Sequence, residues 1–350
     1  SYGSKIYHKD SHILRYIFEK SMSKEGQHFA AIQWARKILG ECGYTLKLIQ
    51  PEIIKNTPWS MVIRFKTDKG NIYLKQMPEK IALEPNVIKV LKEKFNASVP
   101  EIIAQNDQHN CFLMKDSGRP LREKMKEAFD VSLFCEAVSQ FNSLQISVAD
   151  QLDVFFKIGV PDWRLDKLSG LYSEAVHDSD LLLSEGFSLD QIDKIRSFEP
   201  KIIEWSKTLA TYEIPASIIQ PDFHDNNLLI NDESAQLTWI DLGEVLISHP
   251  LFSLFTYLQQ IKKHHGLKEG DDEYEKIKNV CFQPYQQMVG SDETFEQAIS
   301  IAEKLNKVYG IAYQYRFMNI CGKDPLIATN QWKMKNIINE LMEYCNDKGA

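Results

Sequence analysis

The segment from residue 220 to residue 244 constrains this chain most, because acids, amides and a histidine surround two short apolar runs. The runs are Leu228-Leu229-Ile230 and Leu237-Thr238-Trp239-Ile240, and the residues between them, Asn231-Asp232-Glu233-Ser234, favour turns. Short runs of branched and aromatic residues on either side of a turn predict a β-hairpin.

The polar residues at the ends of this hairpin predict a cation site. In an antiparallel hairpin, the residue before the first strand and the residue after the second lie at the same end. Here these residues are Asn227 and Asp241, and Asp222 precedes them by a short distance in the chain. An amide oxygen and two carboxylates are ligands that a hard cation such as Mg²⁺ prefers.

Composition and charge limit the class of protein. The 350 residues suffice for two domains, and 43% hydrophobic and 25% charged residues are typical of a globular protein. The net charge of -7 disfavours a general nucleic-acid binder, whose affinity rests on a basic surface. We find no apolar run long enough for a membrane span and no signal-peptide pattern. The six cysteines lack metal-ligand or redox spacing, so we expect a cytoplasmic protein with reduced thiols; its oligomeric state is left open.

The first third of the chain changes from a helical to a strand pattern. Apolar residues recur at helical spacing over residues 10–42 and include Ile13, Leu14, Ile17 and Phe18, then Phe29, Ile32, Trp34, Ala35 and Leu39. Alternation over 59–66, a turn at 67–70 and a run over 71–75 predict a hairpin, and 99–103 and 111–114 predict two further strands.

Lys75 and Glu84 are expected to pair. Lys75 alone would be interpreted as a solvated strand lysine. However, Glu84 lies on the same predicted helix face as Ile88 and Leu91, which must face the core. An acid there needs a partner, because an unpaired buried charge is unfavourable. Pro85 places Glu84 close to the helix start.

A polar break over residues 115–120 predicts a boundary between two domains, over residues 1–115 and 116–350. Beyond it the pattern is mostly helical, and we interpret the acidic run 269–275 as a solvated loop. The predicted helices are 134–141, 152–156, 165–176, 189–209, one that starts at Ser248-His249-Pro250, 292–317 and 330–345. The expected fold class is therefore α+β.

The order of these motifs resembles the aminoglycoside phosphotransferase and choline kinase family, over roughly residues 50–260. These small-molecule kinases share the protein-kinase fold, in which a strand lysine pairs with a helix glutamate and an asparagine follows the catalytic aspartate by five residues. Asp222 and Asn227 have this spacing. The resemblance implies a small N-terminal lobe with an antiparallel sheet and a larger, mostly helical C-terminal lobe.

The resemblance also implies roles for residues of the second domain. Asp222 would accept the proton of a substrate hydroxyl as that hydroxyl attacks the γ-phosphoryl group of ATP. Asn227 and Asp241 would hold Mg²⁺ on the phosphates. The partner would be a hydroxyl-bearing small molecule, and catalysis would rest on positioning and charge neutralisation.

For the first domain, the resemblance implies a nucleotide site. Lys75, positioned by Glu84, would neutralise the α and β phosphates. The adenine would be held by the backbone near the domain boundary, and a hydroxyl in the phosphate-covering loop would reach a phosphate. The residues concerned are Met114, Lys115 and Asp116 for the adenine and Ser60 for the phosphate.

The chain departs from the family pattern at three places, of which the third is the added negative charge of Asp225 and Glu244. Most members have His-Gly before the catalytic aspartate, where this chain has Gln220-Pro221, so we expect Gln220 to support the loop by another route. The phosphate-covering loop, residues 55–60, has no glycine, which makes close backbone approach to a phosphate harder.

Four further polar residues leave alternatives open. Asp225 and Glu244 either bind a cationic substrate or are solvated loop acids, and we favour the second interpretation. His224 is expected to bond the loop backbone rather than a substrate. His265, next to His264, is interpreted as a cation at a helix end.

Three functions are compatible with the sequence. The first is a small-molecule kinase that uses ATP and Mg²⁺. The second is a nucleotide-binding protein on the same scaffold without catalysis, which Gln220-Pro221 and the glycine-free loop motivate. The third is a metal-dependent phosphohydrolase, which the cluster of Asp222, His224 and Asp225 suggests but no second ligand cluster supports. The phosphate acceptor, and any role in antibiotic resistance, do not follow from the sequence.

Overall fold

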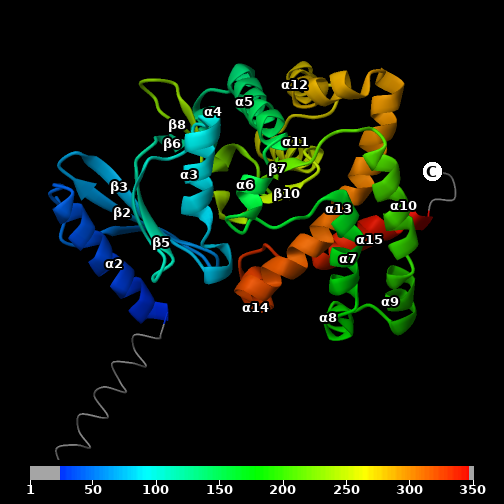
Figure 1. Cartoon of the computed structure of the whole chain (residues 1–350), viewed down its shortest axis with the longest axis horizontal. Helices are drawn as coiled ribbons and strands as arrows, with labels where there is room; N and C mark the ends of the chain where they lie inside the picture. Colours follow the sequence, from blue (N-terminus) through cyan, green and yellow to red (C-terminus); the bar gives the residue numbers. More distant parts are fainter. Residues whose placement is uncertain (1–23, 347–350) are drawn as a thin grey trace, which may run out of the picture. The chain divides into compact units, whose positions relative to one another are not determined.

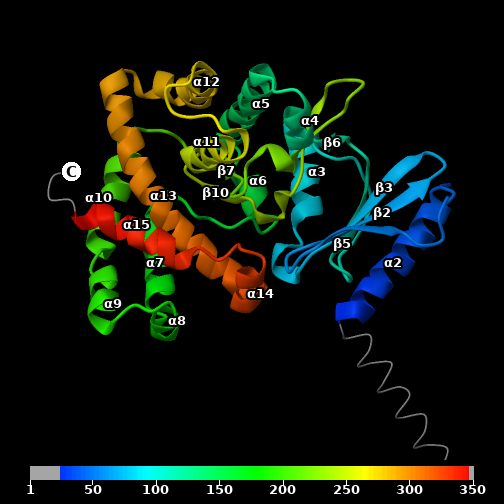
Figure 2. The ribbon, with the colours of Figure 1, turned by 180° about the vertical axis from the view of Figure 1, so that it is seen from behind.

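The computed structural model describes residues 24–346 and forms two compact units (Figures 1 and 2). Among these residues, unit 1 comprises 24–85 and Pro100–Asp116, and unit 2 comprises Asn86–Val99 and 117–346. The predicted helical residues Ile13, Leu14, Ile17 and Phe18 lie outside the described residues. The sequence-based boundary at residue 115 stays a prediction.

Unit 1 is a five-stranded antiparallel sheet in the order β1-β2-β3-β5-β4, with one long helix and a short 3₁₀ helix. The predicted hairpin is confirmed, with Ile63 opposite Leu74. The strand predicted from residue 99 begins later, after Pro100, which has no N–H for a sheet hydrogen bond. Strand β1 was not predicted. The elements are α2 (Lys24–Glu41), β1 (Glu52–Asn56), β2 (Met61–Thr67), β3 (Gly70–Gln76), η1 (Glu79–Ile81), β4 (Ile102–Asn106) and β5 (Cys111–Lys115).

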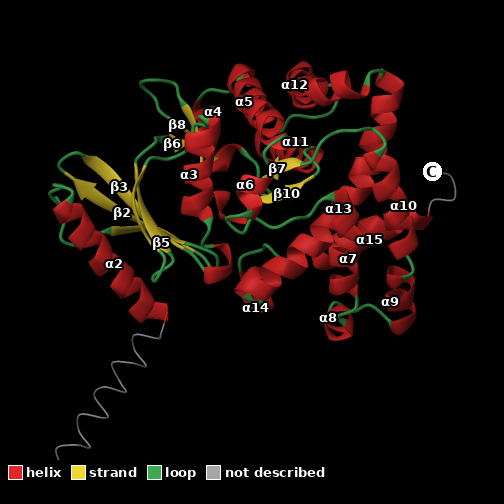
Figure 3. Cartoon of the chain, viewed as in Figure 1, coloured by secondary structure: helices red, strands yellow, loops and turns green. Residues whose placement is uncertain are grey.

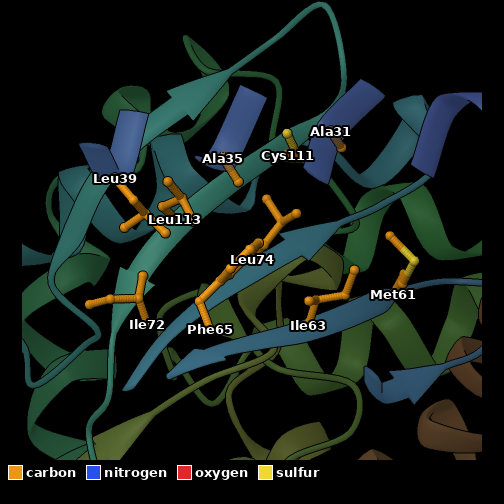
Figure 4. Packing of buried hydrophobic residues seen from close by; sticks show 10 residues of the cluster. All are labelled: Ala31, Ala35, Leu39, Met61, Ile63, Phe65, Ile72, Leu74, Cys111 and Leu113. Carbon is orange, nitrogen blue, oxygen red and sulfur yellow. The ribbon is translucent and has the colours of Figure 1, made fainter. Parts of the chain in front are cut away.

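The core of unit 1 lies between α2 and the sheet. Helix residues spaced by four, Ala31, Ala35 and Leu39, are fully buried against alternate residues of the strands, as Figure 4 shows. This spacing places them on one helix face. Phe29, one of the apolar residues at helical spacing, lies outside this core, because it is 63% exposed.

Unit 2 is mostly helical and contains two small antiparallel sheets, β7 with β10 and β6-β8-β9 (Figure 3). Helix α3 (Glu84–Phe95) begins in unit 1 and continues in unit 2. The strands are β6 (Arg119–Pro120), β7 (Ser217–Ile219), β8 (Leu228–Ile230), β9 (Leu237–Trp239) and β10 (Leu246–Ser248), and the 3₁₀ helices are η2 (Asp225–Asn227) and η3 (Leu242–Glu244). The other helices are α4 (Leu121–Glu127), α5 (Val131–Ala149), α6 (Asp153–Phe156), α7 (Leu165–Val176), α8 (Ser179–Ser184), α9 (Leu189–Arg196), α10 (Glu199–Ala210), α11 (Leu251–His265), α12 (Asp272–Val289), α13 (Asp292–Cys321), α14 (Lys323–Ala328) and α15 (Met334–Asn346).

Two predictions about these helices are wrong. The single helix predicted over 189–209 is two helices, because Pro200 lies in the first turn of α10 and cannot continue a helix from α9. The acidic run 269–275 is not all loop, because α12 begins at Asp272. Its first-turn acids lie where the helix dipole favours negative charge. Among residues 24–346, no helix is long and apolar enough to cross a membrane.

His249, two residues before α11, is fully buried, and this burial lowers its pKa from 6.5 to about 3. In the unfolded chain the imidazole binds a proton near pH 6.5, so acid favours the unfolded state. The free energy of unfolding should therefore fall by about 2 kcal/mol between pH 7 and pH 5 through this group alone.

His249→Leu should remove this pH dependence, which urea unfolding at pH 5, 6 and 7 measures. His177→Leu is the control, because the His177 side chain is 56% exposed. That control should keep the wild-type profile. An unchanged slope in His249→Leu would contradict the prediction.

Candidate functional site

Unit 1 contains a buried ion pair. Lys75 Nζ, on β3, lies 2.6 Å from Glu84 Oε2, at the first residue of α3. The side chains are 5% and 2% exposed. The predicted pairing is confirmed, and Lys75 is not a solvated strand lysine. The two opposite charges neutralise each other in the interior. In protein kinases, the lysine that contacts the phosphates is paired with a glutamate in the same way.

The predicted adenine-binding residues lie at the end of β5. Met114 is paired with Tyr73 on one side and Ile102 on the other. The Lys115 N–H donates to the Glu101 carbonyl at 2.9 Å. Asp116 follows β5, and its carboxylate accepts from Asn71 Nδ2 at 3.0 Å. Their contact with adenine stays a prediction.

The loop before β2 is closed by hydroxyl and backbone groups instead of glycine. The Ser60 N–H donates to Thr57 Oγ1 at 3.1 Å, and the Thr57 N–H donates to the Ser60 carbonyl at 2.9 Å. Ser60 is 4% exposed. Its contact with a phosphate stays a prediction.

Unit 2 contains the predicted hairpin, which is confirmed. Strands β8 and β9 pair with Leu228 opposite Trp239, and the Ile240 N–H donates to the Asn227 carbonyl at 3.1 Å. Asn227 and Asp241 therefore lie at the same end of the hairpin. Asp241 has φ 59 and ψ 49, the left-handed conformation that aspartate tolerates better than most residues.

Two side chains, Asn227 and His224, hold Asp222 in a hydrogen-bond network. Asn227 Nδ2 donates to the Asp222 carbonyl at 2.9 Å and to its Oδ2 at 3.3 Å. The Asn226 N–H donates to His224 Nδ1 at 3.1 Å, so the ring proton resides on Nε2, which lies 3.0 Å from Asp222 Oδ1. His224 bonds the loop backbone, as expected, and also holds the carboxylate. The Asp222 side chain is 64% exposed, so it is open to a reactant.

The residues present fit a Mg²⁺ ion. Because Asn227 donates through Nδ2 to Asp222, its Oδ1 is the amide atom left for a cation. Asp241, at the same end of the hairpin, supplies a carboxylate. Mg²⁺ is commonly bound through one or two such oxygens together with substrate phosphates.

Gln220 supports this region by its side-chain amide, which the sequence did not specify. Gln220 Nε2 donates to the carbonyls of Ile240 and Asp241, at 2.8 and 3.1 Å. The residue is 2% exposed. Gln220 therefore links the start of the Asp222 loop, residues 220–224, to the left-handed backbone at Asp241. This is the other route of support that the absence of the family's histidine led us to expect.

Replacing Gln220 by leucine should destabilise the protein by about 2 kcal/mol, because two part-buried carbonyls lose the donor of a buried side chain. Urea unfolding measures this. Gln236→Leu is the matched control: the side chain of this exposed glutamine donates to Ser98 Oγ, and its loss should change stability by less than about 0.5 kcal/mol. Equal effects of the two substitutions would contradict the role of Gln220.

The interpretation of Asp225 as a solvated acid is wrong. Its side chain is 1% exposed, and Arg122 Nε and Nη2 donate to Oδ1 at 2.9 and 2.7 Å. His265 Nε2 lies 2.6 Å from Oδ2. Burial raises the pKa of this carboxyl, but the hydrogen bonds from His265 and Arg122 outweigh burial and lower the pKa to about 2. His265 lies at the end of α11, as expected, and its buried side chain is a partner of Asp225.

Glu244 also differs from a solvated acid. Its side chain is half-buried and accepts a hydrogen bond from the Tyr313 hydroxyl of α13. Arg316 lies on the same helix, and burial lowers the pKa of its guanidinium while the Glu244 charge raises it. The sequence contained no local signal for Arg122, His265 or Tyr313, because each is distant in the chain from the acid that it contacts.

Solved structures with similar folds belong to small-molecule kinases. A choline/ethanolamine kinase family protein from Mesorhizobium loti aligns over 91% of this chain and 96% of its own, with 13% identity and a TM-score of 0.54. This chain has the fold of these kinases. The predicted α+β, protein-kinase-like fold is thereby confirmed.

Two further structures agree with this small-molecule kinase fold. A choline kinase from Streptococcus pneumoniae aligns over 91% of this chain and 100% of its own, with 11% identity and a TM-score of 0.54. A GDP complex of an aminoglycoside 2′-phosphotransferase variant aligns over 91% and 99%, with 17% identity and a TM-score of 0.53. No protein-family model matches the sequence, and no curated protein matches it.

Proposed function

We propose that this protein is a phosphotransferase that moves the γ-phosphoryl group of ATP to a hydroxyl of a small molecule. The observation that carries the proposal is the network around Asp222. An exposed carboxylate is held by His224 Nε2 at 3.0 Å and by Asn227 Nδ2 at 3.3 Å. A general base must be accessible to the hydroxyl and fixed in orientation, and this arrangement provides both.

In this reaction Asp222 accepts the hydroxyl proton while the hydroxyl oxygen bonds to the γ-phosphorus. The bond from that phosphorus to the β–γ bridging oxygen breaks, and ADP leaves with the electron pair. Asn227 and Asp241 would hold Mg²⁺, which when bound neutralises phosphate charge. Lys75, paired with Glu84, would neutralise the α and β phosphates.

The nucleotide, the metal and the acceptor are part of the proposal. The adenine would contact the backbone of Met114, Lys115 and Asp116, and Ser60 would reach a phosphate. The similar structures are described as acting on choline, ethanolamine or aminoglycosides. These compounds, together with other hydroxyl-bearing metabolites, define the acceptors to be tested.

The test is an ATP-consumption screen with Mg²⁺ over aminoglycosides, choline, ethanolamine, homoserine, sugars and nucleosides, with Asp222→Asn as the control. We expect one class to give a phosphorylated product in the wild type only. Tight ATP binding without any product would favour the non-catalytic nucleotide-binding protein.

Hydrolysis of phosphate esters without ATP would favour the phosphohydrolase. The sequence suggested that alternative through a cluster of Asp222, His224 and Asp225. Asp225 instead pairs with Arg122 and His265, so its carboxylate oxygens are already bound. Across residues 24–346, no group of three or more His, Cys, Asp or Glu side chains is arranged to hold a metal ion.

A further inference from the structure

Helix α11 contacts the Asp222 loop at three places along its length. The Gln220 N–H donates to Ser253 Oγ at 2.8 Å, and Ser253 Oγ donates to the Gln220 carbonyl at 3.0 Å. The Phe223 ring stacks on Tyr257, with centroids 4.8 Å apart and ring planes 20° from parallel. His265, the last residue of α11, lies 2.6 Å from Asp225. Loop and helix therefore run in the same direction.

The two segments have comparable reach, although Pro221 and Asp222 form a turn. The twelve residue steps from Ser253 to His265 span about 18 Å of helix. The five residue steps from Gln220 to Asp225 reach at most about 17 Å when fully extended. His224 has an extended backbone, with φ -161 and ψ 170. The side chains at the two ends supply the remaining reach.

Arg122 of α4 holds the same end of the loop from another direction. Its two donors converge on Asp225 Oδ1, while His265 takes Oδ2. Both carboxylate oxygens are thus occupied by side chains that lie far from Asp225 in sequence. A buried ion pair of this kind is a poor source of stability compared with apolar packing, but it defines one geometry.

We propose that Asp225, fixed by Arg122 and His265, is a positioning residue that keeps the Asp222 carboxylate aligned for proton transfer. This inference rests on the proposed function. If Asp225 loses Arg122 or His265, one end of the loop is no longer fixed. Residues 221–224 can then move relative to Ser253, and Asp222 shifts. A misplacement of about 1 Å at a reacting group lowers a rate by up to about 100-fold.

Two substitutions release the loop without removing a group that touches the reactants. His265→Phe keeps the ring contact with Phe134, whose centroid is 5.0 Å away, but loses the donor. Arg122→Met keeps an unbranched stem and loses the guanidinium. His265→Gln is the conservative variant, because its Nε2–H₂ can replace the imidazole donor and should restore most of the loss.

The controls change neighbouring residues of the same kind. His264→Phe alters the adjacent histidine of α11. Lys124→Met removes an exposed ion pair of α4 with Asp232, at 2.9 Å. Both should behave as the wild type in amide exchange and in turnover.

The first measurement is hydrogen–deuterium exchange of the peptide that covers residues 218–230, without nucleotide. His265→Phe and Arg122→Met should increase exchange of the Asn226 and Asn227 amides at least about 10-fold, because a released segment opens locally. Unchanged exchange in both variants, compared with the controls, would overturn the proposal whether or not the wild type consumes ATP.

The second measurement is Mg²⁺-dependent ATP turnover, with the acceptor found in the screen or with water as the acceptor. In His265→Phe, kcat should fall about 10- to 100-fold with KM for ATP within about twofold, and His265→Gln should recover most of kcat. A loss confined to KM, or no loss, overturns the positioning role. Absent turnover in the wild type contradicts the proposed function, and the exchange measurement then decides the inference by itself.

Discussion

Asp222→Asn is expected to lower turnover by about 10²- to 10⁴-fold and to leave nucleotide binding nearly intact. The asparagine has the size of aspartate but cannot accept the hydroxyl proton. The residue is 64% exposed, so the substitution should have little effect on the fold. His224 Nε2 can still donate to an amide oxygen at this position, which keeps the loop geometry.

The measurement combines single-turnover phosphoryl transfer with calorimetric titration of Mg²⁺–ATP. Asp232→Asn is the matched control, since Asp232 is an acid of the same hairpin, is 51% exposed, and pairs with Lys124. It should retain wild-type turnover. Full activity in Asp222→Asn would show that Asp222 is not the general base. It would not affect the similarity of the fold to that of the small-molecule kinases.

Spacing alone sufficed to predict the parts of the site that are local in sequence. The hairpin of β8 and β9 follows from two apolar runs around a turn, and it brings Asn227 and Asp241 to one end. The pairing of Lys75 with Glu84 follows because a charged residue on an apolar helix stripe must be neutralised. In each case the pattern of apolar residues within one short segment is enough to place the polar side chain.

The sequence could not predict contacts that depend on how distant elements pack. Asp225 looks like a loop acid because its neighbours in sequence are polar, yet its partners Arg122 and His265 are 103 and 40 residues away. The hydrogen bonds of Gln220 to backbone carbonyls have the same origin. Local composition does not predict such burial, because burial depends on which helices pack against the loop.

Two elements, β1 and α12, were not predicted for related reasons. Strand β1 was missed because Ile53 and Ile54 are exposed on an edge strand, so the chain shows no alternation of buried and exposed residues there. Helix α12 was missed because its first turn is acidic, a composition that also suits a solvated loop. Only the apolar residues after these acids, from Tyr274 onward, distinguish a helix from a loop.

Asp225→Asn is expected to destabilise the protein by about 3 kcal/mol at pH 7, measured by urea unfolding without nucleotide. The substitution leaves the Arg122 guanidinium, whose side chain is 14% exposed, without its carboxylate. The loss should exceed that of Asp162→Asn, the matched control. Asp162 also pairs with an arginine, Arg164 at 2.6 Å, but the side chains are 27% and 43% exposed, and such pairs contribute about 1 kcal/mol or less.

The effect of Asp225 should also depend on pH in a defined direction. Its pKa is lowered from 3.8 to about 2 in the folded protein, so the folded state favours the ionised form. This contribution, about 2 kcal/mol, is fully present above the unfolded pKa and is lost as pH falls toward the folded pKa. The stability difference between wild type and Asp225→Asn should therefore shrink by about 1 kcal/mol between pH 5 and pH 3. A difference that stays constant or grows over this range would show that the Asp225 carboxyl is not held ionised by Arg122 and His265.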